Sequence, residues 1–414
     1  MDSYKLYNSC RFCGKKLDKP VINLGYVPLA GGFLKSKKQF SKEKLFPLTL
    51  AFCKNCYLLQ VREVISTDNI FKNYFYYSSA IKTLVDHFKK TVKGFVKRTK
   101  NPKEKLIVEI GCNDGAFIKE CIEQGFNTVG IDPATNVVKP LIRKGLPIMN
   151  EYFTSKTAKK ILKKYGKADI IFSSNTLAHI ENMHEVYKGI ENLLKNNGIL
   201  VFENHYLRNL IKEMQYDMIY HEHQYYYSIN ALVNLLNQHN LEVFDVEFIP
   251  IHAGSIRMYV QKKGGKRKIE KIVLDTLKKE KLERLHLRKT FVDFNKKILE
   301  RKEDLLKLIK ILKKSNKKIA GYGASGRGTI LGNYTGLTNK LLDYVIDDAP
   351  VKQGAFTPGN HLKIVSSLVL NTRERPDYVV LFAWSFWEEI KKRNENYIKS
   401  GGKFIVPLPK VKIV

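Results

Sequence analysis

The stretch LIVEIGCNDG at residues 106–115 decides the fold of the middle of the chain. Its first five residues are mostly apolar and predict a short buried strand, and Gly111 and Gly115 then form a turn before a helical pattern begins. A strand, a glycine turn and a helix in this order indicate a doubly wound α/β domain that binds a ligand at the turn. The spacing Glu-x-Gly-x-x-x-Gly differs from the Gly-x-Gly-x-x-Gly of dinucleotide-binding domains.

The wider turn favours S-adenosylmethionine over a dinucleotide as the cofactor. A pyrophosphate needs close approach to a helix N-terminus, whereas the wider turn lets the backbone pass beside a zwitterionic amino-acid tail. Asp132 ends the strand expected at residues 128–131, and its carboxylate can accept hydrogen bonds from both ribose hydroxyls. Asn175 follows the strand expected at 168–172 and is predicted to line the methyl-transfer side. The predicted cofactor-binding residues are Glu109, Gly111, Asn113, Gly115, Asp132 and Asn175.

Predicted strands and helices alternate over most of the chain. In its middle part, strands are expected at residues 106–110, 128–131, 168–172 and 198–203. This order predicts a parallel, doubly wound sheet. A second strand and glycine turn at 317–328, with further strands expected at 344–346, 378–383 and 404–406, predict a second Rossmann-like unit. The Lys-rich segment 262–318 between the two is expected to be a helical connector.

Four of the six cysteines form two Cys-x-x-Cys pairs, Cys10 with Cys13 and Cys53 with Cys56. Two such pairs supply the four thiolates of a tetrahedral zinc site. The 39 residues between the pairs exceed the usual spacing, so a zinc ribbon with an inserted segment is predicted. The zinc is expected to be structural, because four sulfur ligands leave no position for water or substrate.

The 414 residues include 72 Lys and Arg against 40 Asp and Glu, which gives a net charge of +32. Only 14 of these cations are Arg, the preferred reader of guanine edges and phosphates, so Lys scattered over solvated faces is favoured over a nucleic-acid surface. No apolar run approaches the roughly 18–20 residues that span a bilayer. We expect a cytoplasmic protein, monomeric or weakly oligomeric, without a nucleic-acid or membrane partner.

The segment YDMIYHEHQYYYS at residues 216–228 is dense in groups that can move protons. It is not a zincin motif, because His221 and His223 are two residues apart and share a face only in an extended chain. Methylation of carbon needs a base that makes a carbanion or enolate, and His is the usual choice near neutral pH. His223 is the predicted base, the alternative being a hydrogen-bonded histidine cluster at a domain seam. His179 also lies close enough in sequence to a cofactor strand to reach the reacting centre.

Motifs along nearly the whole chain point to one family. They are CRFCG (10–14), NLGYVPLA (23–30), the pair Cys53 and Cys56, YYSS (76–79), EIGCNDG (109–115), YHEH (220–223), GYGA (321–324), KQGAFTPG (352–359) and GGKFIVP (401–407). Together they resemble the sugar C-methyltransferases of deoxysugar biosynthesis, which methylate nucleotide-linked 4-keto-deoxyhexoses, typically at C3.

The resemblance implies an α/β multidomain fold. A small zinc-binding domain is expected at residues 1–68 and a Rossmann-like class I methyltransferase domain at 69–255. A C-terminal Rossmann-like domain at 256–414 would hold the nucleotide sugar together with the middle domain. Catalytic or orienting roles are implied for His223, Glu222, Tyr220, His179, Tyr74 and Tyr76. Substrate binding is implied for Gly323, Ser325, Arg327, Arg257, His252 and Lys352.

The chain departs from the family pattern at Gly31, at Ala253 and at Arg327-Gly-Thr329, where the family usually has Asn, Gly and Lys-Gly-Asn.

Two other functions are compatible with single motifs. The Gly-x-Gly-x-x-Gly at 321–326, with an acidic residue near the usual distance, suits a nicotinamide dehydrogenase. Zinc with abundant Lys suits an RNA methyltransferase. The C-methyltransferase is favoured because the same turn suits a nucleoside-diphosphate sugar and the sequence contains no separate hydride-accepting site.

Overall fold

The strand and turn at residues 106–115 lie in the middle of a seven-stranded sheet. A computed structural model describes residues 4–66, 74 and 77–414. The strands of this sheet are β6 (Leu106–Ile110), β7 (Asn127–Ile131), β8 (Ile148–Met149), β9 (Ala168–Ser174), β10 (Leu194–His205), β12 (Leu241–Ile249) and β13 (Ser255–Lys262). Their order across the sheet is β12-β13-β10-β9-β6-β7-β8. β13 is antiparallel to β10 and β12, and the strands from β10 to β8 are parallel, so the predicted doubly wound sheet is confirmed.

Helices cover both faces of this central sheet, so all five residues of β6 are buried. They are α2 (Lys82–Arg98), α3 (Ala116–Glu123), α4 (Thr135–Arg143), α5 (Ser155–Tyr165), α6 (Met183–Leu193), α8 (Ile229–Asn237) and α9 (Lys271–Leu282). The short helix α7 (Leu207–Lys212) instead packs into the core that the N-terminal and C-terminal units share. Short 3-10 helices are η2 (Ser78–Ala80), η3 (Pro102–Glu104), η4 (Leu177–His179), η5 (Tyr216–Met218) and η6 (Ile251–Ala253). The apolar face of α2 packs on one side of the sheet, where Phe88 meets Phe117 and Phe172 edge-on.

The N-terminal unit is a small β structure. Its elements are β1 (Tyr4–Leu6), β2 (Ile22–Val27), η1 (Lys37–Lys42), β3 (Phe46–Phe52), β4 (Leu59–Val61) and β5 (Glu63–Ile65). β1 pairs with β5, and the other strands form a four-stranded sheet in the order β11-β4-β3-β2. The edge strand β11 (Tyr225–Tyr226) comes from the central unit, so the two units share one sheet.

The C-terminal unit contains the second doubly wound sheet that the sequence predicts. Its elements are β14 (Ile319–Tyr322), α11 (Gly326–Thr335), β15 (Val345–Ile346), η7 (Pro350–Lys352), β16 (Ile364–Val365), η8 (Ser367–Asn371), β17 (Tyr378–Leu381), η9 (Trp384–Phe386), α12 (Trp387–Arg393), α13 (Glu395–Lys399), β18 (Lys403–Val406) and β19 (Lys412–Ile413). The order is β16-β15-β14-β17-β18-β19, parallel except for β19. The glycine turn follows the inner strand β14, as predicted.

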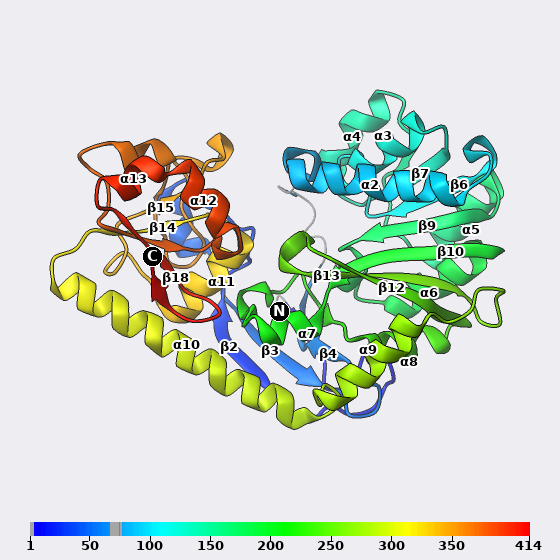
Figure 1. Cartoon of the computed structure of the whole chain (residues 1–414), viewed down its shortest axis with the longest axis horizontal. Coiled ribbons are helices and arrows are strands. Elements are labelled where there is room, and N and C mark those ends of the chain that lie inside the picture. The colour runs from blue at the N-terminus through cyan, green and yellow to red at the C-terminus, as the bar shows by residue number, and fades with distance from the viewer. Residues whose placement is uncertain (1–3, 67–73, 75–76) are drawn as a thin grey trace.

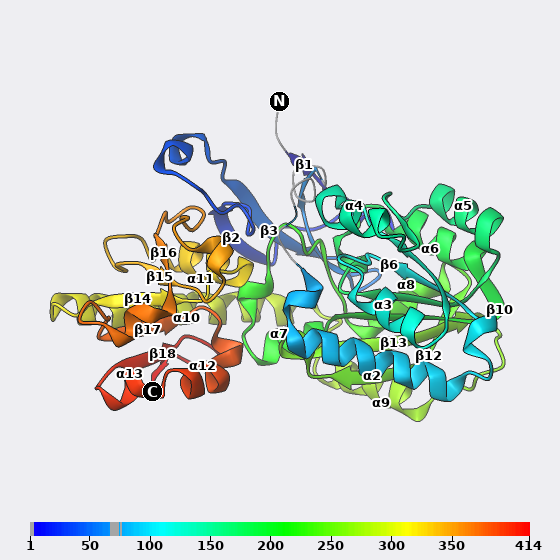
Figure 2. The ribbon, with the colours of Figure 1, turned by 90° about the horizontal axis from the view of Figure 1, so that it is seen from above.

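The long helix α10 (Arg288–Lys314) connects the two α/β lobes, and in Figure 1 it runs beneath the C-terminal lobe and the strands β2 and β3. The strands of the N-terminal unit lie between the lobes, and Figure 2 shows this unit projecting from between them. Phe291 of α10 packs on Phe52 of β3 with ring centroids 4.6 Å apart. α10 therefore fixes the N-terminal unit against the C-terminal one, and the expected connector consists of two helices, α9 and α10.

The division into units at 68/69 and 255/256 remains a proposal, and the sheet topology bears on the second border. β13 pairs along its length with β10 and with β12. A border at 255/256 would separate this strand from both partners, so we propose that the C-terminal unit begins after Lys262.

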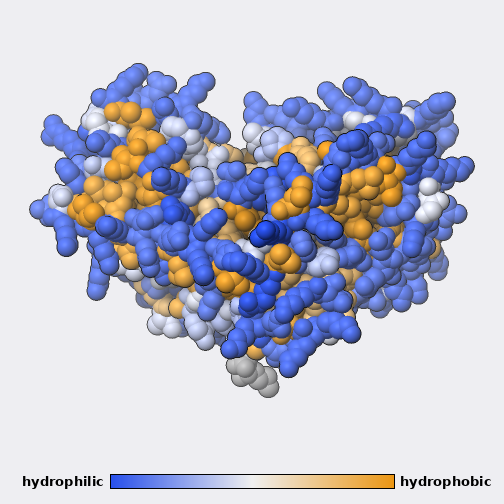
Figure 3. Space-filling model, turned by 60° about the horizontal axis from the view of Figure 1, so that its bottom comes forward, coloured by the Kyte–Doolittle hydropathy of each residue, from blue (hydrophilic) through white to orange (hydrophobic). Residues whose placement is uncertain are grey.

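The surface is mostly hydrophilic. Figure 3 shows one face on which hydrophilic residues predominate and hydrophobic ones form smaller areas between them. This agrees with the expectation that the abundant Lys side chains lie on solvated faces. Within the described part of the chain, every helix is too short or too polar to cross a membrane.

Candidate active site

A cavity of about 540 Å³ lies between the central and C-terminal units. Most of its wall comes from the carboxyl ends of the central strands and the loops that follow them. The C-terminal unit contributes Ser325, Gly326, Arg327 and Phe386. The strand order reverses between β6 and β9, and ligands of doubly wound sheets bind at this switch point, beyond the carboxyl ends of the strands.

The glycine turn after β6 lies at the switch point. Gly111 has φ +79°, and a Cβ at this position would lie 2.1 Å from Oγ1 of Thr176. Only glycine permits the turn to approach the loop after β9 this closely. Gly115 has φ +72° and precedes α3, but it is not among the described residues that line the cavity. The structure therefore brings Gly111 to the cavity and gives Gly115 a role in starting the helix.

Two acidic residues face the predicted cofactor. Glu109 lines the cavity, its Oε2 is buried, and this atom has no hydrogen-bond partner among the described residues. Burial and the neighbouring carboxylates raise the pKa of Glu109 well above its usual value. The carboxylate of Asp132 accepts hydrogen bonds from the backbone N–H groups of Asn113 (2.9 Å) and Ala134 (2.8 Å). Each of its oxygens keeps a second lone pair, so a cationic group beside Glu109 and hydroxyls beside Asp132 would complete the site.

Asn113 and Asn175 adopt left-handed backbone conformations, with φ +48° and +52°. Asn tolerates this region better than other residues with a side chain. Both line the cavity. Oδ1 of Asn113 accepts a hydrogen bond from the backbone N–H of Ser78 at 3.0 Å, which fixes the start of the segment before α2. Five of the six predicted cofactor residues thus meet at the cavity.

His223 lies in the same cavity, on the side of the C-terminal unit. Its Nδ1 donates a hydrogen bond to the backbone carbonyl of Met218 at 2.8 Å. Three aromatic rings surround the imidazole: Tyr220 at 3.9 Å between centroids, His205 at 4.9 Å and His179 at 5.0 Å. Burial lowers the pKa of His179 to about 4, and it raises that of Tyr220 well above 10. At neutral pH His179 is therefore uncharged and Tyr220 is a protonated phenol.

The other predicted catalytic residues are more varied in position. Tyr74 lines the cavity, and its backbone is held by the side chain of Asn136. Tyr76 lies outside the described residues. Glu222 is not among the described cavity residues, although burial raises its pKa to about 7. Its Oε2 is buried, and no described residue donates a hydrogen bond to it.

Of the predicted substrate residues, Ser325 and Arg327 are among the described residues of the cavity wall. The guanidinium of Arg327 makes a two-pronged ion pair with Asp217, at 2.9 and 3.2 Å. Asp217 has a fully buried side chain and also accepts a hydrogen bond from Nε1 of Trp384 at 2.8 Å. The guanidinium lies 4.9 Å from the Trp384 ring centroid and donates to Ser385. We call this group, Arg327, Asp217, Trp384 and Ser385, the clasp, because it joins the C-terminal unit to the segment before His223.

The remaining predicted substrate residues lie away from the described cavity wall. Gly323 forms the turn after β14 with φ +102°. Nζ of Lys352 donates to the carbonyl of Ala324 at 2.7 Å and pairs with Asp347 at 3.3 Å. Arg257 is buried in β13 and pairs with Glu203 of β10 and Glu247 of β12. The backbone of His252 belongs to η6, and its side chain lies outside the described part of the structure.

The four paired cysteines converge in the N-terminal unit. Each offers a sulfur, and all four sulfurs lie within 4.8 Å of one another. The Cys10–Cys56 and Cys13–Cys53 separations are 3.6 and 3.4 Å. These are near the edge of about 3.8 Å expected for a tetrahedron with zinc–sulfur bonds of about 2.3 Å. The thiols are not joined as disulfides, so the cluster fits one zinc ion with four thiolate ligands.

The zinc unit holds the segment that carries His223. Arg11, between the first two cysteines, donates from Nη2 to the backbone carbonyls of Val61 (2.7 Å) and Gln224 (3.1 Å). Its guanidinium also stacks over Tyr225, 4.3 Å from the ring centroid. Gln224 directly follows His223, so the first cysteine pair and strand β4 fix the chain next to the predicted base.

His205 was not predicted as a site residue, yet it lines the cavity and contacts His223. It ends β10, the strand next to β9 in the parallel part of the sheet. Strand ends at the switch point are where functional residues gather, and this signal would have identified His205. Phe386 also lines the cavity, but its sequence context gives no comparable signal.

A doubly wound sheet with this acidic glycine turn defines a class I methyltransferase, and three family profiles agree. Residues 85–246 match a methyltransferase domain. Residues 10–71 match a zinc binding domain, and residues 250–409 match a C-methyltransferase C-terminal domain. The predicted fold, enzyme class and zinc-binding unit are therefore confirmed.

The chain belongs to the C-methyltransferase family. It is 30% identical over 413 residues to the C-methyltransferase NovU of Streptomyces niveus, a match that covers 100% of this chain and 98% of NovU. A tRNA U34 carboxymethyltransferase of Helicobacter acinonychis is 29% identical over 120 residues, which cover 26% of this chain and 43% of that protein. A SAM dependent methyltransferase from Archaeoglobus fulgidus has 15% identity and a TM-score of 0.35, with 43% of this chain and 94% of that chain covered.

Proposed function

We propose that the enzyme transfers a methyl group from S-adenosylmethionine to C3 of a nucleotide-linked 4-keto-deoxysugar, with His223 as the general base. The hydrogen bond from Nδ1 of His223 to the Met218 carbonyl is the observation that carries this proposal. A carbonyl only accepts, so Nδ1 carries the ring proton and Nε2 of the neutral ring has the lone pair. A histidine held in this tautomer at a cavity wall is suited to remove a proton from carbon.

The residues present fit S-adenosylmethionine. The buried acceptor of Glu109 suits an ammonium group, and Asp132 can accept hydrogen bonds from ribose hydroxyls. Gly111 lets the backbone approach the ligand at the switch point. When bound, the cofactor supplies an electrophilic methyl group on a sulfonium.

The proposed chemistry begins at the ketone. A carbonyl at C4 acidifies the proton on C3, and Nε2 of His223 removes this proton to give an enolate. Tyr220 stays protonated because burial raises its pKa, and its ring lies 3.9 Å from that of His223. Its hydroxyl can therefore donate to the enolate oxygen. A bond forms between C3 and the methyl carbon while the bond from that carbon to sulfur breaks; its electron pair stays on sulfur, and S-adenosylhomocysteine is the neutral leaving group. The proton remains on His223 until it passes to solvent.

The nucleotide end of the substrate would lie against the C-terminal unit. Ser325 and Gly326 begin α11, where backbone N–H groups of a helix N-terminus face the cavity side. Gly326 lies against both Ala30 of the N-terminal unit and Tyr220 of the central unit. All three units therefore meet where we propose that the sugar is held. A cytoplasmic location and a monomer or weak homo-oligomer remain predictions from the sequence.

The test compares His223→Asn with His221→Asn. His221 is two residues away and buried, and it donates from Nε2 to the Pro47 carbonyl rather than lining the cavity. Labelled S-adenosylmethionine and a panel of nucleotide-linked 4-keto sugars are supplied in deuterated water. His223→Asn should lose C3 exchange and methyl transfer by roughly a hundred- to ten-thousand-fold, and His221→Asn should keep both.

Three results would contradict the proposal. One is near-normal turnover by His223→Asn, and another is methylation of sugars that lack the keto group. The third is tight binding of a nicotinamide cofactor in place of S-adenosylmethionine, which would favour the dehydrogenase alternative.

A further inference from the structure

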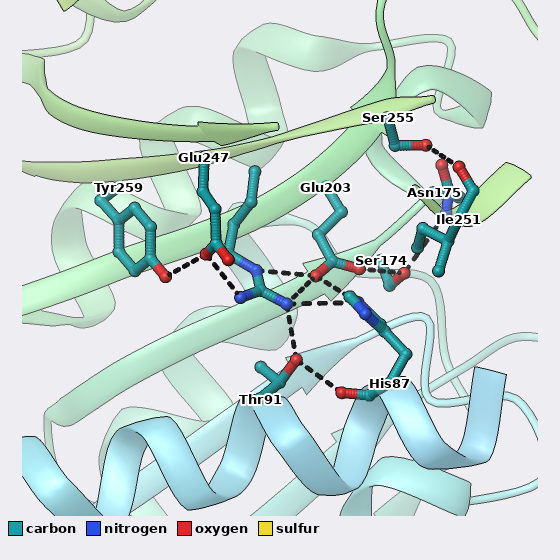
Figure 4. A network of polar contacts seen from close by, with 10 residues as sticks. His87, Thr91, Ser174, Asn175, Glu203, Glu247, Ile251, Ser255 and Tyr259 are labelled. Carbon is teal, nitrogen blue, oxygen red and sulfur yellow. Dashed lines mark hydrogen bonds and ion pairs between the residues drawn. The ribbon is translucent and has the colours of Figure 1, made fainter. Parts of the chain in front are cut away.

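A buried ion pair lies directly behind the cofactor side of the cavity. The carboxylate of Glu203, at the end of β10, has a fully buried side chain and pairs with Arg257 of β13. The Nε and Nη2 atoms of Arg257 lie 2.8 and 2.6 Å from Oε1 of Glu203. The two residues are direct partners in the antiparallel register of β10 and β13. Figure 4 shows Glu203 facing helix α2, which contributes His87 and Thr91.

Glu203 is held as a carboxylate by its neighbours. Burial alone would raise its pKa, but the hydrogen bond with His87 and the positive charge of Arg257 lower it below the usual value. Nε2 of His87 lies 2.8 Å from Oε1, which leaves Oε2 for Ser174. Arg257 is also fixed from the far side, by Glu247 at 2.9 Å and by Thr91 at 2.6 Å.

The direction of the hydrogen bonds determines how Asn175 is oriented. Oγ of Ser174 donates its single proton to Oε2 of Glu203 at 2.8 Å. The same oxygen can then only accept, so the Asn175 atom 3.3 Å away is the amide nitrogen Nδ2. The carboxamide carbon has one other polar atom, Oδ1, which therefore points away from Ser174. Figure 4 shows Glu203, Ser174 and Asn175 in this order.

The backbone holds Asn175 in the same place. Its N–H donates to the backbone carbonyl of Glu203 at 2.8 Å, and its φ of +52° turns the chain away from the strand. Asn175 lines the cavity, and Oδ1 is buried without a hydrogen-bond donor among the described residues. A buried carbonyl oxygen needs a partner of positive character, and a bound cation can supply it.

We propose that Arg257, Glu203 and Ser174 are positioning residues that aim Oδ1 of Asn175 at the positive sulfonium end of the methyl donor. The inference rests on the proposed function for the identity of the donor. S-adenosylmethionine carries a positive charge at sulfur, and the product S-adenosylhomocysteine does not. An acceptor aimed at the sulfonium therefore strengthens binding of the donor more than binding of the product.

This role accounts for a motif that the sugar chemistry leaves unexplained. Arg257 ends the stretch HAGSIR at residues 252–257, for which the sequence implies substrate binding. The Arg257 side chain is 8% exposed, and its donors are directed to Glu203, Glu247 and Thr91. Its hydrogen bonds lead toward the cavity through Glu203 and Ser174.

The experiment measures the affinities of S-adenosylmethionine and S-adenosylhomocysteine by calorimetry in Ser174→Ala. The variant keeps the Arg257–Glu203 ion pair but removes the link to Asn175. Loss of this one hydrogen-bonded link should weaken donor binding roughly two- to tenfold, with product binding changed less than about twofold. Ser173→Ala is the matched control, since Ser173 is the preceding residue of β9 and its hydroxyl donates to the Ile110 carbonyl at 2.9 Å rather than to Glu203. It should leave both affinities unchanged.

A second variant shows whether the effect passes through Asn175. Asn175→Gly suits the positive φ and removes the acceptor, so it should lose the same preference for the donor. Adding Ser174→Ala to it should then have no further effect. The proposal is overturned if Ser174→Ala weakens donor and product equally, weakens neither, or still acts in the Asn175→Gly background. If the wild-type enzyme does not bind S-adenosylmethionine, the proposed function itself fails, and the proposed positioning of Asn175 fails with it.

Discussion

Replacing Arg327 with Ala should destabilise the protein strongly, because the change leaves a buried carboxylate without its cation. The side chain of Asp217 is 0% exposed, and Arg327 supplies two of the three hydrogen bonds that the structure gives it. After the substitution, Nε1 of Trp384 is the one remaining donor to Asp217 among the described residues. Breaking a buried ion pair by removing one partner costs about 3–5 kcal/mol in the free energy of unfolding.

A surface ion pair provides the comparison. Arg301 pairs with Asp304 at 2.9 Å on α10, and the Asp304 side chain is 50% exposed. Arg301→Ala should cost only about 0.2–1 kcal/mol, because exposed pairs are screened by water.

A second substitution in the clasp should raise stability rather than lower it. Asp217→Asn should restore part of the stability lost in Arg327→Ala, since an amide is far less costly to bury unpaired than a carboxylate.

Tryptophan fluorescence during urea unfolding is the direct assay. The chain has two tryptophans, Trp384 in the clasp and Trp387 at the start of α12. The signal therefore reports the junction of the C-terminal unit with the central one. We expect a red-shifted emission and a lower urea midpoint for Arg327→Ala. Equal midpoints for Arg327→Ala and Arg301→Ala, or further destabilisation when Asp217→Asn is added, would refute the reasoning.

Three further outcomes are expected. Cys53→Ser should reduce bound zinc, measured by metal analysis, to well below one equivalent and unfold the N-terminal unit, since four thiolates hold the ion; full zinc content would contradict the site. Gly111→Ala should cost at least about 1–2 kcal/mol, because φ is +79° and the new Cβ would clash with Thr176. Gly94→Ala, in helix α2 with open space around it, should instead stabilise by about 1 kcal/mol; urea unfolding compares the two. Burial raises the pKa of Glu222 to about 7 from a usual value of 4.5. Between pH 4.5 and about pH 7 the Glu222 carboxyl is therefore protonated in the folded state and ionised in the unfolded state, so the folded state loses stability as the pH rises over this range. Glu222→Gln should therefore gain thermal stability relative to the wild type between about pH 5 and pH 8, and a pH-independent difference would contradict the burial.

The parts of the site that lie close together in sequence could be predicted from it. The strand, the turn at Gly111 and the acidic strand end at Asp132 have fixed spacings, because each follows from one strand-turn-helix unit. The same holds for the zinc site, in which each Cys-x-x-Cys pair brings two sulfurs together locally. The sequence therefore predicts the cofactor class and the metal without knowledge of the tertiary fold.

Contacts across the sheet could not be predicted in this way. Arg257 lies beside Glu203 because of the antiparallel register of β13 with β10, which a hydrophobic pattern does not specify. In sequence, Arg257 follows a glycine-containing turn and is therefore expected to bind an anionic substrate. In the structure, its side chain is buried and pairs with the carboxylates of Glu203 and Glu247. The contact of His205 with His223 likewise depends on strand ends that meet only when the sheet is complete.

The pairing of β4 with β11 bears on how such enzymes can be recombined. The first unit ends its sheet with Tyr225 and Tyr226, residues encoded more than 150 codons downstream and beginning two residues after His223. A chimera that exchanged only residues 4–66 between two relatives would join strands that had never been selected to pair. The zinc unit and the base segment should therefore be inherited together.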